Sequence, residues 1–154
     1  MKRILVLAVV AALLAGCANE AMQRSDAAIA WKKTLPESNA DYGSAPKDYQ
    51  GTIKAYIAAN LKDPDSARYG GFADPVQGYA IVDSNRKSVV YGYSACVLVN
   101  AKNSYGGYTG NHLYWLLIKN EKVLFSSDLS SNQYARMAYG DDLAKCIRYK
   151  YDFN

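Results

Sequence analysis

The sequence contains one histidine, His112, and a lone imidazole does not complete a metal site or a catalytic centre. The neighbouring carboxylates Asp63 and Asp65, and Asp141 and Asp142, have a simpler role as helix caps, because a carboxylate at a helix start accepts hydrogen bonds from free backbone amides. No serine stands in a Gly-x-Ser-x-Gly segment. We therefore predict no catalytic residue, no metal ligand and no cofactor, and interpret His112 as an exposed or edge-strand residue.

A segment rich in glycine and asparagine, from residue 100 to residue 112, is the best candidate for a binding site. In a structural interpretation, its glycines allow chain reversal, its asparagines bond loop backbone groups, and Tyr105 and Tyr108 pack against the sheet edge. It is not a phosphate loop, because no Gly-Lys-Ser/Thr follows and a strand comes next.

The alternative is a recognition loop, since tyrosine, serine, glycine and asparagine are typical of binding loops. Simple reversal of the chain would need fewer residues, which favours a contribution to recognition. The candidate binding residues are then Asn100, Lys102, Asn103, Tyr105, Tyr108 and His112.

Strands on both sides must position this segment. Alternating apolar and polar residues predict strands at 78–83, 88–100, 112–119 and 122–127, with a two-residue hairpin turn at 120–121. In the long strand we expect the core face to be Val89, Tyr91, Tyr93, Ala95, Val97 and Val99. The pattern lacks βαβ spacing and therefore favours a small antiparallel sheet of three to four strands.

Helices flank these strands in the sequence. Apolar residues spaced at three, four and eight residues from Ile53 predict a helix over 49–61. Asp63 then caps a short turn that has Pro64 at its first position. We expect this turn to end at the glycine pair Gly70-Gly71. Helical signals return over 131–149. We predict an α+β domain with an N-terminal and a C-terminal helix packed on one side of the sheet.

The N-terminus carries a basic pair, an apolar stretch from Ile4 to Leu14, and small residues before Cys17. The stretch is shorter than the roughly 20 residues that span a bilayer. The order of basic pair, apolar stretch, small residues and cysteine resembles the signal peptide and lipobox of bacterial lipoproteins. The resemblance implies cleavage after residue 16 and a lipid anchor on Cys17. Ala18, in place of the aspartate that retains such proteins at the inner membrane, implies an outer-membrane location facing the periplasm. The other interpretation is an ordinary secretory leader.

Residues 17–47 are polar, contain two prolines and have scattered apolar residues. We interpret them as the lipidated cysteine and a flexible tether, with a loose helix near 20–33. The single globular domain then comprises 48–154.

Two cysteines remain once Cys17 is lipidated. Cys96 and Cys146 have no Cys-x-x-Cys spacing, so a redox or metal pair is disfavoured. In an oxidising compartment outside the cytoplasm we expect them to form a disulfide. The bond would close a loop of about 50 residues and stabilise the fold by roughly 4 kcal/mol on the chain-entropy description.

The globular part also resembles a family of small, mostly uncharacterised bacterial proteins. The matching parts are Lys62-Asp63-Pro64-Asp65-Ser66 and a second segment that begins at Cys96 and reads Cys-x-x-x-Asn-x-Lys-Asn-x-x-Gly-x-Tyr-x-Gly. The likeness spans most of residues 53–118. It implies a common fold and brings no established activity.

The charge of the chain argues against nucleic-acid binding. Its formal net charge is +4, Lys2 and Arg3 leave with the leader, and no later basic run is longer than Lys32-Lys33. We expect a non-enzymatic envelope protein that binds an envelope protein or a cell-wall component. The alternatives are a periplasmic inhibitor or immunity lipoprotein that acts on a wall-degrading enzyme, and an envelope hydrolase with His112 as its base.

Overall fold

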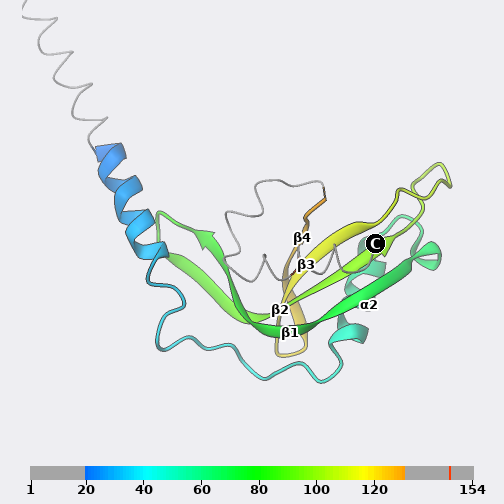
Figure 1. Ribbon diagram of the computed structural model, residues 1–154, viewed down its shortest axis with the longest axis horizontal. Coiled ribbons are helices and arrows are strands. Elements are labelled where there is room, and N and C mark those ends of the chain that lie inside the picture. Colours follow the sequence, from blue (N-terminus) through cyan, green and yellow to red (C-terminus); the bar gives the residue numbers. More distant parts are fainter. Residues whose placement is uncertain (1–19, 131–145, 147–154) are drawn as a thin grey trace, which may run out of the picture.

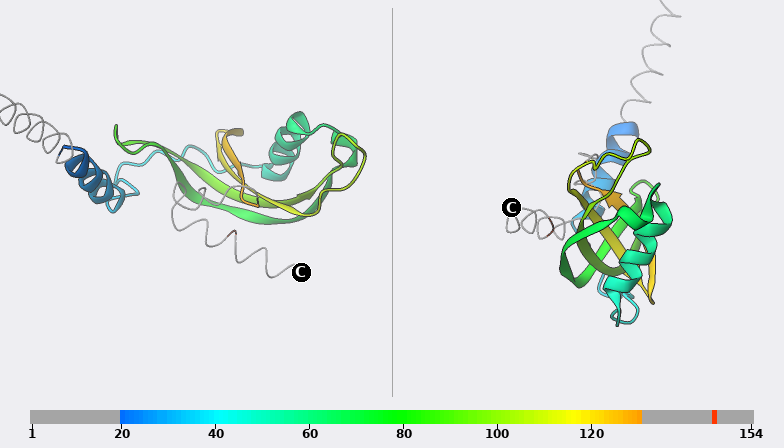
Figure 2. Two further views of the ribbon diagram at one scale, coloured as in Figure 1. Left: turned by 90° about the horizontal axis from the view of Figure 1, so that it is seen from above. Right: turned by 90° about the vertical axis from the view of Figure 1, so that its right-hand side faces the viewer.

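The computed structural model describes residues 20–130 and Cys146 (Figure 1). Its globular elements are α2 (Tyr49–Asn60), the 3-10 turn η1 (Pro64–Ser66), β1 (Arg68–Asp83), β2 (Ser88–Asn100), β3 (His112–Lys119) and β4 (Lys122–Asp128). The strands form one antiparallel sheet in the order β1-β2-β3-β4, and α2 lies on one face of it (Figure 2). The predicted α+β class and antiparallel sheet are confirmed.

Helix α2 begins where a side chain caps it. The carboxylate of Asp48 accepts a hydrogen bond from the Gly51 amide at 2.8 Å, which satisfies one of the free amides of the first turn. Ile53 and Ile57 are fully buried, as the spacing of the apolar residues predicts. Burial of this stripe against the sheet holds the helix in place.

Strand β1 begins at Arg68, well before the predicted start at Gly78. The turn after α2 therefore ends at Ala67, and Gly70-Gly71 lies inside the strand, contrary to the prediction. Its pairing with β2 shifts register between Tyr69 and Phe72 and again between Ala73 and Val76. Such bulges interrupt the alternation from which a strand is recognised.

The sheet is apolar on both faces, whereas the sequence indicated one core face. Side chains of alternate β2 and β3 residues, with Ile53 and Ile57 of α2, form the first buried cluster. The residues between them form a second cluster on the other face, which includes Leu98, Trp115 and Cys146. The fold is therefore a layered core with the sheet in the middle.

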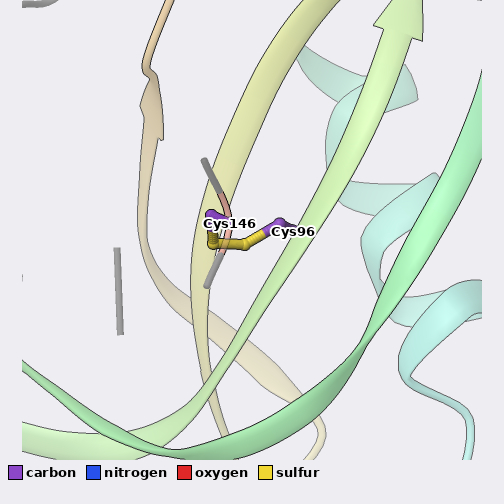
Figure 3. Close-up of a disulfide and its surroundings, with 2 residues drawn as sticks. All are labelled: Cys96 and Cys146. Carbon is purple, nitrogen blue, oxygen red and sulfur yellow. A yellow bond between two sulfur atoms is a disulfide. The ribbon is translucent and has the colours of Figure 1, made fainter. Parts of the chain in front are cut away.

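A disulfide joins Cys96 of β2 to Cys146, with Cα atoms 5.7 Å apart (Figure 3). It confirms the predicted bond. Cys146 belongs to the cluster on the face opposite α2. Cys146 is the one described residue of the predicted C-terminal helix, so the prediction that both terminal helices pack on one side of the sheet stays a prediction. The remainder of the predicted helix over 131–149 lies outside the described residues.

Residues 20–32 are helical, and the chain after them is hydrogen-bonded to residues of the sheet. The Glu37 amide donates to the Tyr91 hydroxyl at 2.9 Å, and Lys119 binds the Asp41 carboxylate at 2.8 Å. This hydrogen bond lowers the pKa of Asp41. The part of the predicted tether near residues 37–47 thus contacts the domain. Cys17 and the leader lie outside the described residues.

None of the described helices is both long and apolar enough to cross a bilayer.

Candidate functional site

The segment between β2 and β3 is a loop whose tip is fixed by one asparagine. The Asn103 side-chain oxygen accepts hydrogen bonds from the amides of Tyr105, at 2.9 Å, and Gly107, at 3.1 Å. The backbone amide of Asn103 donates to the Gly107 carbonyl at 2.8 Å. Gly106 has φ of +80°, a conformation that L side chains rarely adopt. The tip is therefore a closed turn with a defined backbone.

The base of the loop is bonded across its two arms. The Asn100 side-chain oxygen accepts from the Gly110 amide at 3.1 Å, and the Ala101 carbonyl accepts from both the amide and the hydroxyl of Thr109 at 3.2 Å. The amide of Lys102 donates to the Ser66 hydroxyl of η1 at 2.9 Å. Both arms are thereby tied to each other and to the turn that follows α2.

Two tyrosines of the loop differ in their surroundings. Tyr105, at the tip, is 96% exposed, so it does not pack against the sheet edge as the structural interpretation required. Tyr108 is 40% exposed, and two cations lie over its ring, with Arg68 Cζ at 4.2 Å and Lys102 Nζ at 5.6 Å from the ring centroid. We call Arg68, Lys102, Tyr105 and Tyr108 the aromatic–basic patch.

His112 projects to the other face of the same end of the sheet. Paired strand residues share a face, and His112 pairs with Val99, which packs on the α2 face. Lys102 pairs with Tyr108. Since Lys102 stands three positions after Val99, it points to the opposite face. The predicted binding residues are thus divided between two surfaces.

An open cavity of about 120 Å³ lies at the α2 face. Its polar lining consists of Thr109, His112, Tyr114 and Asp128. His112 Nδ1 is 2.8 Å from a carboxylate oxygen of Asp128, and the other carboxylate oxygen accepts from the Ser130 amide at 2.8 Å. Burial, together with the charge of Asp128, raises the pKa of Tyr114. The cavity therefore joins a histidine–carboxylate pair to a half-buried phenol.

Sequence reasoning identified His112 but not Asp128, Tyr114 or Arg68. Asp128 stands one residue beyond the predicted end of the last strand, which runs to residue 127. Arg68 precedes the predicted start of the first strand at residue 78. The motif segment with Ser66 was noted, although the bond of Ser66 to the loop was not. A search for charged residues next to the predicted strand ends would have found Asp128. It would not have found Arg68, which lies ten residues before the predicted strand start.

Within residues 20–130 and Cys146, no group of three or more histidine, cysteine, aspartate or glutamate side chains could hold a metal ion.

No protein-family model, curated protein or solved structure matches the chain.

Proposed function

We propose that this protein is a lipid-anchored cell-envelope protein with a non-enzymatic domain, and that the loop of residues 101–111 binds an envelope protein or a cell-wall component. The observation that carries the proposal is Tyr105, a large side chain left 96% exposed at the tip of a loop with an internally bonded backbone. A fixed loop loses little conformational entropy on binding, and tyrosine supplies a large contact area.

The position of the loop supports this role. The helix of residues 20–32 and the loop lie at opposite ends of the long axis of the molecule (Figure 1). An anchor on Cys17 would hold the domain by the end with that helix. The aromatic–basic patch would then be presented away from the membrane, where a partner can reach it.

Cys17 and the location of the protein are part of the same proposal. We place the protein at the outer membrane, facing the periplasm, because of the lipobox resemblance and Ala18. The diacylglycerol and amide-linked chains on one residue would give firm anchoring, at about 0.8 kcal/mol for each buried methylene. The disulfide in the domain is consistent with an oxidising compartment.

Replacement of Cys17 by serine tests the anchor. We expect Cys17→Ser to abolish incorporation of labelled palmitate, because the thiol is the acceptor of the lipid. The variant protein should then be found uncleaved or soluble instead of in the mature membrane-bound form. Metabolic labelling and membrane fractionation measure both effects. Cys96→Ser is the control and should retain the label. Unchanged acyl incorporation in Cys17→Ser would contradict the anchor.

Replacement of Tyr105 by alanine tests the loop. We expect Tyr105→Ala to weaken capture of the partner from an envelope extract by about tenfold or more at an unchanged melting temperature, because interface energy is concentrated in few residues and Tyr105 makes no buried contact. Lys102→Ala should weaken capture to a smaller extent.

Val82→Ala is the matched control for Tyr105→Ala. Val82 is an exposed apolar residue, at 52%, near the turn at the other end of β1. It should leave both capture and melting unchanged. Capture that survives in every folded loop variant would show that the loop is only a connection between strands.

A narrower form of the proposal is an inhibitor or immunity lipoprotein that inserts the loop into the cleft of a wall-degrading enzyme. The observation that favours it is the projection of the loop beyond the sheet (Figure 1). Tyr105, in the turn that Asn103 closes, is 96% exposed. Inhibition of a purified wall hydrolase by the protein, lost in Tyr105→Ala, would distinguish this form.

An envelope hydrolase is the second candidate, because of the pair formed by His112 and Asp128 at a cavity. A carboxylate on Nδ1 orients an imidazole for proton transfer at Nε2, and Thr109 lines the same cavity. The hydroxyl of Thr109, however, is engaged with the Ala101 carbonyl. Wall-degrading activity that is lost in His112→Ala would favour this candidate over binding.

A further inference from the structure

The two cations of the aromatic–basic patch have no acidic partner. Arg68 begins β1 and is exposed, and Lys102 lies half-buried in the first arm of the loop. Both lie over the ring of Tyr108, at 4.2 Å and 5.6 Å from its centroid. Among the residues that the structure describes, neither side chain takes part in an ion pair. The patch therefore presents two positive charges that an anion from another molecule can neutralise.

The contact with Tyr108 holds the Arg68 side chain and leaves its donors for a ligand. A guanidinium over an aromatic ring is attracted through its face, whereas its N–H groups lie at its edge. These edge donors match the two oxygens of a carboxylate, which a guanidinium binds bidentately. Because the side chain is already held, it loses less conformational entropy when an anion binds.

The backbone of the loop argues against a phosphate as that anion. Phosphate sites in loops use successive backbone amides that point at the ligand. Here the amides are engaged within the protein at residues 102, 103, 105, 106, 107, 109 and 110. Recognition is therefore left to the side chains. One guanidinium satisfies both oxygens of a carboxylate but leaves the further oxygens of a phosphate without donors.

The residue types of the patch favour a protein as the source of the carboxylate. Arginine and tyrosine are enriched in protein–protein interfaces, where they carry much of the binding energy. Tyr105 is 96% exposed and lies midway in the sequence between Lys102 and Tyr108. An extended acidic segment can cover this ring together with the cations, whereas a small carboxylate at Arg68 would leave the ring in water.

We propose that the aromatic–basic patch binds an acidic segment of a partner protein. The Arg68 guanidinium holds a side-chain carboxylate of that segment with two hydrogen bonds, Lys102 adds a second positive charge, and Tyr105 packs against a neighbouring residue of the partner. The inference rests on the proposed binding role of the loop and names the chemistry of its partner.

Calorimetry on the full chain in nonionic detergent micelles tests the patch. The probe is a capped peptide of glutamate and glycine, and the reference is the same peptide with glutamine in place of glutamate. We expect the glutamate peptide to bind at least about tenfold more tightly, because a hydrogen bond between charged groups is stronger than one with a neutral amide. Its affinity should fall as salt is added, since the cations are near the surface.

Variants of the two cations separate charge from geometry. Arg68→Gln removes the charge, and we expect about tenfold weaker binding of the glutamate peptide. Arg68→Lys keeps the charge but lacks the guanidinium fork, so it should recover only part of the affinity. Lys102→Gln should have a smaller effect, because an ammonium group acts as a point charge. Melting temperatures show that each variant is folded.

The matched control is Arg86→Gln, because Arg86 is an exposed arginine in the turn that follows β1, at the opposite end of the strand from Arg68. It should leave binding unchanged. The proposal is overturned if folded Arg68→Gln retains full affinity for the glutamate peptide. It is also overturned if the glutamine peptide, a glycerol phosphate oligomer or a muropeptide binds as tightly as the glutamate peptide.

Capture from an envelope extract separates the acidic partner from the binding role of the loop. We expect Arg68→Gln and Tyr105→Ala both to weaken capture. If only Tyr105→Ala weakens it, the loop binds a partner but the acidic segment is wrong. If neither variant weakens capture, the binding role of the loop fails, and the acidic partner fails with it.

Discussion

Removal of the disulfide should lower the free energy of unfolding by about 4 kcal/mol. Cys96 and Cys146 are separated by 50 residues in the sequence, and a bond across such a loop restricts the unfolded chain by that amount on the chain-entropy description. Both residues are 2% exposed, so the change to alanine also removes buried sulfur. Urea denaturation of the double variant Cys96→Ala/Cys146→Ala, compared with the original chain, measures the loss.

Urea denaturation in the presence of a reducing agent provides the control for this prediction. The reducing agent should shift the unfolding midpoint of the original chain toward that of the double variant and should leave the double variant unaffected. Protein recovered from the envelope should carry no free thiol at either position. Rapid alkylation of both cysteines without reductant, or a midpoint that reductant does not move, would contradict a stabilising bond.

Three of the strands could be predicted from the sequence because their signals are local. Strand β2 has a long apolar alternation rich in valine and tyrosine, and its bounds at Ser88 and Asn100 are those predicted. The turn at Asn120 and Glu121 was expected from its length alone. Both residues have positive φ, of 49° and 59°, which is the backbone of a two-residue hairpin turn.

The first part of β1 could not be predicted because tertiary pairing overrides its local signal. The segment contains Gly70, Gly71 and Pro75, which weaken strand propensity. Pro75 is accepted because β1 is at the edge of the sheet, where a missing amide leaves no gap in the ladder. Pairing along most of β2 therefore keeps the segment extended.

The second buried face was missed for a different reason. Cys96 and Leu98 alternate with Val97 and Val99, so all of these β2 residues are apolar, and alternation alone cannot say which face is covered. The position of Cys146, the disulfide partner of Cys96, shows that the face of Cys96 and Leu98 is covered as well. Because Cys146 packs on the face of Cys96, a distant part of the chain, rather than a local pattern, makes that face a core.

The pair of His112 and Asp128 depends on a β-bulge. With the regular register set by the pair of Lys119 and Lys122, Asp128 would stand opposite Leu113 and point away from His112. The observed register shifts between Leu117 and Ile118, so that Asp128 stands opposite Tyr114, on the face of His112. The hairpin turn could be predicted from the sequence, but this shift could not.

Trp115→Ala should be the most damaging single substitution in the described sheet, with a loss of about 3–5 kcal/mol in the free energy of unfolding. Trp115 is 0% exposed on β3 and belongs to the cluster around the disulfide. Its removal leaves a cavity that the β-strands, hydrogen-bonded on both sides of β3, cannot close. Denaturant titration of the purified full chain measures the effect.

The matched control for Trp115→Ala is Tyr105→Ala, which also truncates a large aromatic side chain but at a position that is 96% exposed. Its effect on unfolding should stay within about 0.5 kcal/mol, as for other surface substitutions. The comparison tests the layered core directly, because Trp115 and Ile53 lie in clusters on opposite faces. If Trp115→Ala costs less than about 1 kcal/mol while Ile53→Ala costs several, then packing against α2 alone stabilises the sheet and the second face is not a core.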